Sequence, residues 1–368
     1  MTWEILFIIG IFVFSVLAGW IYLPQIVLIA KKRKLYDVID ARKSHVGAIP
    51  RIGGLSFFPI FLLSITLFCC IRYALGYPIS NVSEVSVFLD LLCLISGLTL
   101  MYLVGLADDL SGVSYKIKFI IQIMAALSVV LGGFWINNLQ GVLGIYEIPW
   151  FLGMPLTILV AVFVMNAYNL IDGIDGLCSG LSAFSLSLIG LWFLFNGLLF
   201  YGMMSFAILG VLSVFFCMNV FGTKNKIFMG DTGSLTLGFI IVFLGFKFYW
   251  FSTNTDVVSF QNPLASLLGI TFVPLFDTVR VFALRISKGL SPFYPDKNHI
   301  HHKFLQLGFG HRSSAMCIII MQSMYCLVNT VLQPLNINII LIADVTIALL
   351  GYVMIDYIIK LKANKEVK

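Results

Sequence analysis

Acidic side chains lie close together in three short segments of an otherwise apolar chain. Five of the 17 Asp and Glu residues fall in GLADDL, NAYNLIDGIDGL and FMGDTGS, and they are Asp108, Asp109, Asp172, Asp175 and Asp231. Ionisable groups among long apolar stretches are costly and indicate a functional site. Carboxylate and amide oxygens without cysteine favour Mg²⁺, with Mn²⁺ as the alternative, over zinc. Because Mg²⁺ completes its coordination with water and substrate phosphates, the pattern predicts a phosphate-bearing substrate.

The second segment carries polar side chains at every third residue. Asn166, Asn169, Asp172 and Asp175 follow this spacing, which drifts by about 60° per step on an α-helix. A 3₁₀ turn would align the side chains, and the glycines of the segment permit such a turn. We therefore expect the asparagines in the last turn of a helix and the aspartates in the following loop, aimed at one centre. The alternative, an asparagine-rich turn, explains the glycines but not the regular spacing.

Two lysines near the first segment suit the charge of a phosphate. Asp108 and Asp109 are adjacent carboxylates, and like charges repel unless a cation lies nearby. Lys116 and Lys118 follow them closely in the sequence. We expect a metal ion or a lysine beside the aspartates, and Lys116 and Lys118 are available for the phosphates of a substrate.

A histidine cluster occurs in the polar segment PDKNHIHHKF. His299, His301 and His302 fall within four residues of one another, which is a spacing that can bind zinc. No cysteine accompanies them and adjacent histidines ligate one ion poorly, so we expect cations or hydrogen-bond donors for a phosphate. His311 stands alone and is expected to be an ordinary loop residue. For Asp277, a helix cap and a functional role are equally good interpretations.

The composition shows that the elements holding these residues lie in a membrane. Of the 368 residues, 60% are hydrophobic and 11% are charged, against about 45–50% and about 25% in soluble domains. The mean hydropathy is +1.01. This excludes a soluble enzyme, a disordered regulator, a fibrous protein and a secreted disulfide scaffold. The seven cysteines lie in or beside apolar runs and are expected to be buried hydrophobes.

The sequence predicts an all-α integral membrane protein with about eleven transmembrane helices. Apolar stretches of spanning length occur near 5–29, 51–71, 88–107, 119–136, 150–168, 177–195, 201–221, 233–251, 262–284, 315–334 and 338–360. The first is expected to remain as a span, because its positive charges follow it rather than precede it as in a signal peptide. We expect one polytopic domain over 1–368, with active-site loops near 30–50, 107–118, 166–177, 222–233 and 285–314.

The distribution of positive charge predicts the orientation. All but two of the 23 Lys and Arg residues fall on one side of this topology, and the two exceptions are Arg72 and Lys247. The positive-inside rule then places the N-terminus outside, with the C-terminus and the acidic loops in the cytoplasm. The net charge of +6 is explained by loops lying on anionic lipid, so no nucleic-acid partner is expected.

Together the motifs resemble one family of membrane enzymes, the polyprenyl-phosphate N-acetylhexosamine-1-phosphate transferases. The resemblance lies in six segments that occur in the family's order over most of the chain: HVGAIPRIGG (45–54), GLADDL (105–110), YKIKFIIQ (115–122), NAYNLIDGIDGL (166–177), FMGDTGSLTLG (228–238) and SPFYPDKNHIHH (291–302). Members of this family have ten or eleven spans and active-site loops in the cytoplasm. The resemblance therefore implies a multi-pass protein of the cell (inner) membrane.

The resemblance also implies a reaction and a role for each matched residue. A membrane polyprenyl (undecaprenyl) phosphate attacks the β-phosphate of a UDP-N-acetylhexosamine, UMP is released, and Mg²⁺ is required. Asp231 matches the metal-binding aspartate, and Asn169 matches the second protein ligand. The catalytic and substrate-binding positions are Asp108 and Asp109 (metal binding or deprotonation of the lipid phosphate), Asp172 and Asp175 (nucleotide-side loop), Lys116 and Lys118 (phosphates), Asn166, and the histidine motif His299, His301 and His302.

Two departures bear on the donor sugar. The peptidoglycan branch of the family has a lysine where this chain has His45, and it has HHH where this chain has HIHH. Both departures resemble the branch that uses small UDP-N-acetylhexosamines for O-antigen, capsule or teichoic-acid-type polymers. We expect UDP-GlcNAc as the donor, with UDP-GalNAc or a modified sugar as near alternatives. Phospho-N-acetylmuramoyl-pentapeptide transferase activity is the alternative within the family.

Other classes of membrane protein fit the sequence less well. A secondary transporter has its carboxylates near the bilayer midplane on broken helices, whereas these carboxylates lie at one interface. A prenyl-chain synthase has DDxxD, but Gly112 takes the place of the last aspartate. A CDP-alcohol transferase has DGxxAR, which the segment after Asp172 does not match. A homodimer is left open by the sequence.

Overall fold

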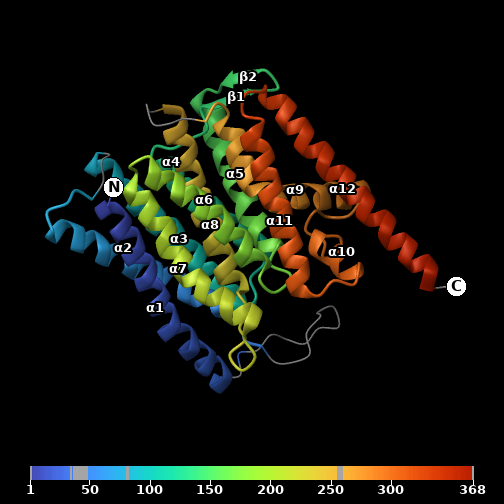
Figure 1. The fold of residues 1–368 in the computed structure, drawn as a ribbon, viewed down its shortest axis with the longest axis horizontal. Coiled ribbons are helices and arrows are strands. Elements are labelled where there is room, and N and C mark those ends of the chain that lie inside the picture. Colours follow the sequence, from blue (N-terminus) through green and yellow to red (C-terminus); the bar gives the residue numbers. More distant parts are fainter. Residues whose placement is uncertain (1, 34, 36–48, 80–82, 255–259, 367–368) are drawn as a thin grey trace.

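The computed structural model describes residues 2–33, 35, 49–79, 83–254 and 260–366, most of which are helical (Figure 1). Its elements, in chain order, are α1 (Thr2–Arg33), the 3₁₀ helix η1 (Gly53–Ser56), α2 (Phe57–Ala74), α3 (Glu84–Ser111), α4 (Tyr115–Leu131), β1 (Asn138–Val142), β2 (Ile145–Glu147), α5 (Trp150–Leu170), α6 (Leu177–Phe195), α7 (Leu199–Phe221), α8 (Gly230–Asn254), α9 (Pro263–Ser287), α10 (Ile300–Gln306), α11 (His311–Val331) and α12 (Ile337–Glu366).

The all-α membrane architecture is confirmed. Each of the eleven apolar stretches coincides with a helix, and ten helices of the described residues are long and apolar enough to cross a membrane. The remaining one, α4, has 17 residues and ends at Leu131, because Gly132 and Gly133 follow it and Gly133 has a φ of +87°. The antiparallel hairpin β1–β2, which the sequence analysis did not predict, connects α4 to α5.

Helix α8 forms the centre of the bundle. Of its most apolar stretch, 89% is buried, against 28% for α1 and 28% for α12, whose outward faces expose large apolar side chains to lipid. Helices α3, α5 and α6 pack directly on α8. Glycines permit the close approach: a Cβ on Gly97 or Gly105 of α3 would meet the Phe239 ring at 2.0 Å and Thr232 Cα at 2.4 Å.

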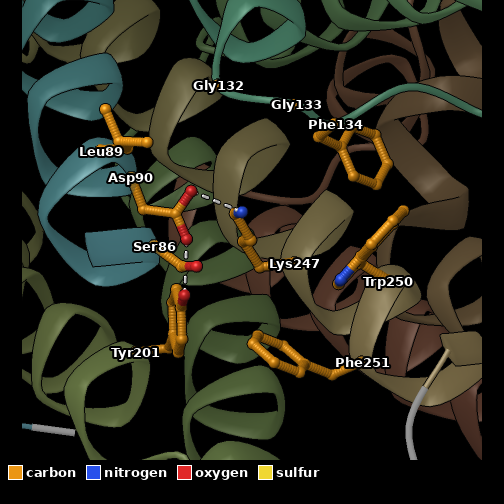
Figure 2. Close-up of a pocket in the computed structure, with 10 residues that line it drawn as sticks. All are labelled: Ser86, Leu89, Asp90, Gly132, Gly133, Phe134, Tyr201, Lys247, Trp250 and Phe251. Carbon is orange, nitrogen blue, oxygen red and sulfur yellow. Dashed lines mark hydrogen bonds and ion pairs between the residues drawn. The ribbon is translucent and has the colours of Figure 1, made fainter. Parts of the chain in front are cut away.

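A buried ion pair joins α3 and α8 far from the acidic segments. Lys247 Nζ lies 2.6 Å from Asp90 Oδ1, and the Tyr201 hydroxyl donates to Asp90 Oδ2 at 2.5 Å (Figure 2). These groups line a cavity of about 190 Å³. Lys247 lies sixteen residues after Asp231, which is about 24 Å along the helix. The pair therefore stabilises the end of the bundle opposite to the first turn of α8.

Helix α9 continues through Pro274, and side chains from two neighbouring helices bond to its backbone around this residue. Proline removes the N–H that would bond to the Ile270 carbonyl, and the Ser185 hydroxyl of α6 donates to that carbonyl at 2.9 Å. Gln322 of α11 accepts from Val273 N–H at 2.8 Å and donates to the Gly269 carbonyl at 2.5 Å. In a membrane every freed backbone group requires such a partner. These hydrogen bonds hold α9 against α6 and α11.

Candidate active site

Backbone contacts hold the segment before α8 against the first residues of η1. Gly53 N–H donates to the Phe228 carbonyl at 2.9 Å, and Gly54 N–H donates to the Met229 carbonyl at 2.9 Å. A Cβ on Gly54 would lie 2.1 Å from the backbone nitrogen of Gly233. The paired glycines of IPRIGG are therefore required by the close approach of two backbones. This contact brings Arg51 next to the FMGDTGS segment.

The two adjacent aspartates of GLADDL have different partners. Asp108 accepts from Val113 N–H at 2.6 Å and from Lys118 Nζ at 2.7 Å. Asp109 accepts from the backbone N–H groups of Asp231 and Thr232, at 2.8 and 2.9 Å, and from the Thr232 hydroxyl at 2.6 Å. Asp109 therefore contacts the first turn of α8, whereas Asp108 faces the lysine.

Lys118 joins the GLADDL and FMGDTGS segments. Its Nζ lies 2.7 Å from Asp108 Oδ2 and 2.6 Å from Asp231 Oδ2. Arg51 Nη2 approaches Asp231 Oδ1 at 3.6 Å. Lys118 is placed by the first turn of α4, and Asp231 by the first turn of α8. The sequence analysis counted Arg51 only as a loop charge, although its position beside the paired glycines of IPRIGG was the available signal.

The asparagines of NAYNLIDGIDGL lie in the last turn of α5, as the spacing predicts. Asn169 Nδ2 donates to Ser234 Oγ of α8 at 2.9 Å, and no described residue donates to its Oδ1. Asn166 Nδ2 donates to Gln122 Oε1 and to the Val162 carbonyl, both at 2.7 Å. Asn169 is therefore linked to the first turns of α8, while Asn166 is linked to α4.

The two aspartates after α5 lie in the loop but have different surroundings. Burial raises the pKa of Asp172 to about 7; the charge of Arg51 lowers it, and the charges of Asp231, Asp109 and Asp175 raise it further. The charge of Asp231 at the start of α8 therefore contributes to the raised pKa of Asp172.

Asp175 belongs to a separate ion pair. Its Oδ2 lies 2.6 Å from Lys226 Nζ and 3.3 Å from His311 Nδ1. Burial raises the pKa of Asp175, but the hydrogen bonds from His311 and Lys226 outweigh this effect and hold it below its usual value. The expectation that His311 is an ordinary loop residue is therefore wrong: it begins α11 and contacts a candidate site carboxylate.

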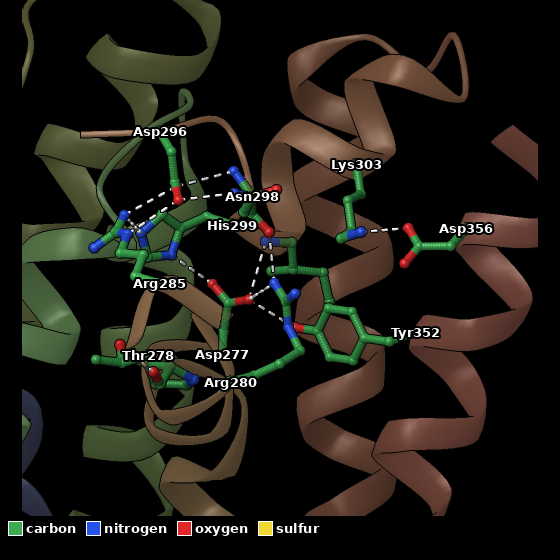
Figure 3. A network of polar contacts seen from close by, with 12 residues as sticks. Asp277, Thr278, Arg280, Arg285, Asp296, Asn298, His299, Lys303, Tyr352 and Asp356 are labelled. Carbon is green, nitrogen blue, oxygen red and sulfur yellow. Dashed lines mark hydrogen bonds and ion pairs between the residues drawn. The ribbon is translucent and has the colours of Figure 1, made fainter. Parts of the chain in front are cut away.

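His299 is part of a buried network that anchors the loop after α9. Its Nδ1 lies 2.8 Å from Asp277 Oδ2, and Asp277 Oδ1 accepts from Arg280 and from the Tyr352 hydroxyl, both at 2.8 Å (Figure 3). Asp277 is fully buried. In the structure this carboxylate is not a simple helix cap. Both of its oxygens are bonded to protein groups. It joins α9, the loop and α12.

His301 faces the NAYNLIDGIDGL loop. A Cβ on Gly173 would lie 2.1 Å from His301 Nε2, so the imidazole packs directly on that backbone. Its Nδ1 has no hydrogen-bond partner in the part of the chain that the structure describes. Burial, together with the neighbouring His302 and His299, lowers the pKa of His301 to about 3. Burial also lowers the pKa of His302. At neutral pH His301 is therefore a neutral hydrogen-bonding group, which is the second of the two roles expected from the sequence.

Two further candidates are not brought to this centre. The Lys116 side chain is exposed and makes no hydrogen bond or ion pair with the described residues. His45 lies outside the residues that the structure describes.

The oxygen donors around Lys118 fit Mg²⁺. Across the described ranges, no three His, Cys, Asp or Glu side chains are grouped to hold a metal ion. Mg²⁺ does not need such a group, because one or two carboxylates with water and substrate phosphates suffice. Asp231 and Asp108 already share one cation, the Lys118 ammonium, and Asn169 offers an amide oxygen. This donor set contains only oxygen, which is the preference of a hard cation.

The fold and this centre define a polytopic membrane protein with carboxylates and a lysine gathered at the ends of α3, α4, α5 and α8. The sequence matches the model of the family described as Glycosyl transferase family 4 over residues 91–248. Curated relatives extend the similarity over most of the chain.

These relatives carry one name in distant bacteria. The undecaprenyl-phosphate alpha-N-acetylglucosaminyl 1-phosphate transferase of Escherichia coli (strain K12) is 30% identical over 298 residues, which cover 79% of this chain and 74% of that protein. The protein of this name from Salmonella typhi is 32% identical, covering 84% and 79%. A probable undecaprenyl-phosphate N-acetylglucosaminyl 1-phosphate transferase of Bacillus subtilis is 31% identical, covering 89% and 85%. The chain belongs to this family of sugar-1-phosphate transferases.

Proposed function

We propose that the protein transfers GlcNAc-1-phosphate from UDP-GlcNAc to undecaprenyl phosphate and releases UMP. The observation that carries this proposal is the Lys118 ammonium held between Asp108 and Asp231, beside Arg51 and Asn169. Such a centre suits two anionic substrates that must approach one another. The names of the relatives support the same substrates.

The reaction needs little covalent chemistry from the protein. A phosphate oxygen of the lipid forms a bond to the β-phosphorus of the sugar nucleotide, and the bond from that phosphorus to the bridging oxygen of UMP breaks. Catalysis of this kind rests on positioning and on neutralising charge. Lys118 and Arg51 supply positive charge, and Asp108 orients Lys118 towards the reacting phosphates. Asp231 and Asn169 would hold Mg²⁺, which when bound supplies Lewis-acid stabilisation of the phosphate charge.

The histidine loop would close one side of the same centre. His301 packs on Gly173 between Asp172 and Asp175, and its unpaired Nδ1 suits a hydrogen bond to a substrate. His299 holds the loop through Asp277, which places His301 without contacting substrate itself. His299 and His301 therefore have different roles in this proposal.

An apolar cavity supports a prenyl chain as the second substrate. Its volume is about 250 Å³, and side chains of α5, α8 and α9 line it, among them Val160, Val164, Phe246 and Leu268. Val164 lies two residues before Asn166 in α5, and the lining residues of α8 begin at Ile241, ten residues after Asp231. The cavity therefore lies in the apolar part of the bundle, where a hydrocarbon tail would fit.

The distribution of charge supports a cytoplasmic active site in the cell (inner) membrane. Lys118, Arg51 and Lys226 lie among the positively charged connections, which face the cytoplasm under the positive-inside rule. Sugar nucleotides are made in that compartment. Labelling single cysteines in intact cells should reach position 254 from outside but not position 225, and strong external labelling at 225 would reverse this orientation.

The donor is tested by product analysis. Purified protein and undecaprenyl phosphate are incubated with UDP-GlcNAc, UDP-GalNAc or UDP-MurNAc-pentapeptide, and UMP and the lipid product are measured. We expect UDP-GlcNAc to be used best, because His45 and HIHH depart from the peptidoglycan branch. Faster turnover of the pentapeptide donor would show that the branch assignment is wrong while leaving the family intact.

A further inference from the structure

Asp108 and Asp109 are neighbours on one helix, and consecutive helical side chains diverge by about 100°. The hydrogen-bond partners of the two carboxylates differ accordingly. Asp108 Oδ2 meets the Lys118 ammonium, whereas both oxygens of Asp109 are turned to the backbone of α8. One residue of the pair therefore faces the polar centre, and the other faces a helix terminus.

The first N–H groups of a helix have no partner within that helix. At α8, Asp109 supplies the acceptors from a different helix: Oδ1 accepts from Asp231 N–H, and Oδ2 accepts from the N–H and hydroxyl of Thr232. A carboxylate there is also stabilised by the positive end of the helix dipole. With three donors at 2.6 to 2.9 Å, its oxygens are occupied by the protein itself.

The surrounding glycines show that α3 and the Arg51 backbone approach the first turn of α8 closely. A Cβ on Gly230 would lie 2.2 Å from the Arg51 carbonyl and 2.5 Å from Asp109 Oδ2, and Gly230 has a φ of +75°. A Cβ on Gly105 would lie 2.4 Å from Thr232 Cα. The first turn of α8 therefore packs closely on α3, and the hydrogen bonds of Asp109 cross this contact.

We propose that Asp109 is a positioning residue: it holds the first turn of α8 and so determines where the Asp231 carboxylate meets Lys118, while Asp108 is the member of the pair that faces the reacting phosphates. This inference rests on the proposed function. It assigns Asp109 to neither the metal nor the proton transfer, the two roles that the resemblance left open. Its action passes through the backbone of Asp231 and through Thr232.

The test compares Asp109→Asn, Thr232→Val and the double variant, with Thr232→Ser and Asp108→Asn as controls. An asparagine keeps one acceptor oxygen but turns an NH₂ donor towards the α8 backbone, and valine keeps the shape of threonine without its hydroxyl. The readouts are UMP release, the pH profile of kcat, the unfolding temperature, and hydrogen exchange of a peptide covering 228–236.

We expect Asp109→Asn to raise hydrogen exchange at the start of α8 and to lower kcat by up to about 100-fold, which is the cost of a displacement near 1 Å. Thr232→Val should act in the same direction, and the double variant should be no worse than the worse single one, because both lose one contact. Thr232→Ser should behave as the wild type. Asp108→Asn should lose turnover without a change in exchange, and the acid limb of the kcat profile should persist in Asp109→Asn.

Other results overturn the proposal. Asp109→Asn that loses turnover with unchanged hydrogen exchange, or loses the acid limb, would make Asp109 a ligand or a base. Effects of the two single variants that multiply in the double variant would show independent roles. If Asp109→Asn does not fold, Thr232→Val decides alone, and unaltered kcat and exchange in that variant would refute the inference. A wild type that releases no UMP would reject the proposed function. Hydrogen exchange would still test whether Asp109 holds the first turn of α8.

Discussion

Replacing Lys118 by glutamine removes an ammonium group that joins Asp108 to Asp231. The ammonium lies 2.7 and 2.6 Å from the two carboxylates, and none of the three side chains is more than 21% exposed. Hydrogen bonds between charged groups contribute about 1.5–3 kcal/mol each, so the two bonds contribute about 3–6 kcal/mol. At about 1.4 kcal/mol per factor of ten, this corresponds to a loss of about 10²–10⁴ in kcat/KM if the contacts matter in the transition state.

The assay measures UMP release over a series of substrate concentrations and of Mg²⁺ concentrations, which gives both kcat and kcat/KM. Glutamine leaves two carboxylates without their shared cation, so a divalent ion should be held more tightly. We therefore expect Lys118→Gln to lower kcat while the Mg²⁺ concentration for half-maximal activity falls. Lys116→Gln is the matched control, because that lysine is exposed and unpaired among the described residues, and its activity should stay within about threefold of the wild type.

Two outcomes would refute this reasoning. One is Lys118→Gln with activity close to that of the wild type. The other is an equal loss in Lys116→Gln, which would mean that general positive charge matters and the geometry around Lys118 does not.

Three further perturbations have defined outcomes. Asp231→Asn should abolish turnover in a folded protein, and EDTA should inhibit the wild type reversibly; activity without a divalent cation contradicts this. Lys247→Met alone should lower the free energy of unfolding by about 3–5 kcal/mol, and adding Asp90→Leu should restore most of it; an unaltered unfolding midpoint in the single variant rejects the buried pair. Because the pKa of His301 is lowered to about 3, the unfolded chain takes up a proton below about pH 6.5 and the folded chain does not. Stability should therefore fall by about 1.4 kcal/mol per pH unit from 6.5 towards 3, and His301→Gln should flatten the dependence of the unfolding temperature between pH 7 and 5.

Local sequence patterns predict most of the helices of the fold. Apolar runs of spanning length located eleven of the twelve α-helices of the described residues and missed the short α10, and the three-residue spacing placed Asn166 and Asn169 in the last turn of α5. These features depend on properties of neighbouring residues, such as apolar periodicity and glycine, that a single sequence displays. The end of α4 was misplaced, because the predicted stretch runs to 136 although two glycines follow Leu131.

The division of roles within the motifs depends on contacts between distant segments. Helical geometry shows that Asp108 and Asp109 diverge, but only the packing of α3 on α8 shows that Asp109 meets a helix terminus. In the same way, no local pattern indicates that His311 would meet Asp175 across 136 residues. The sequence therefore located these polar segments and left the individual partners of their residues open.

The hydrogen bonds that α6 and α11 make to the backbone of α9 also depend on contacts between distant segments. Pro274 predicts a break in the helix, but not that Gln322 and Ser185 would bond to the freed backbone. Buried polar side chains on α6 and α11 were available as a signal only after the neighbours of α9 were known.

The most direct test of the central claim is UMP release by the purified protein with undecaprenyl phosphate and UDP-GlcNAc. The proposed function predicts stoichiometric UMP and undecaprenyl-pyrophosphoryl-GlcNAc from the wild type, and neither product from Asp231→Asn. A folded wild-type protein that releases no UMP with any UDP-N-acetylhexosamine, or an Asp231→Asn variant as active as the wild type, would contradict it.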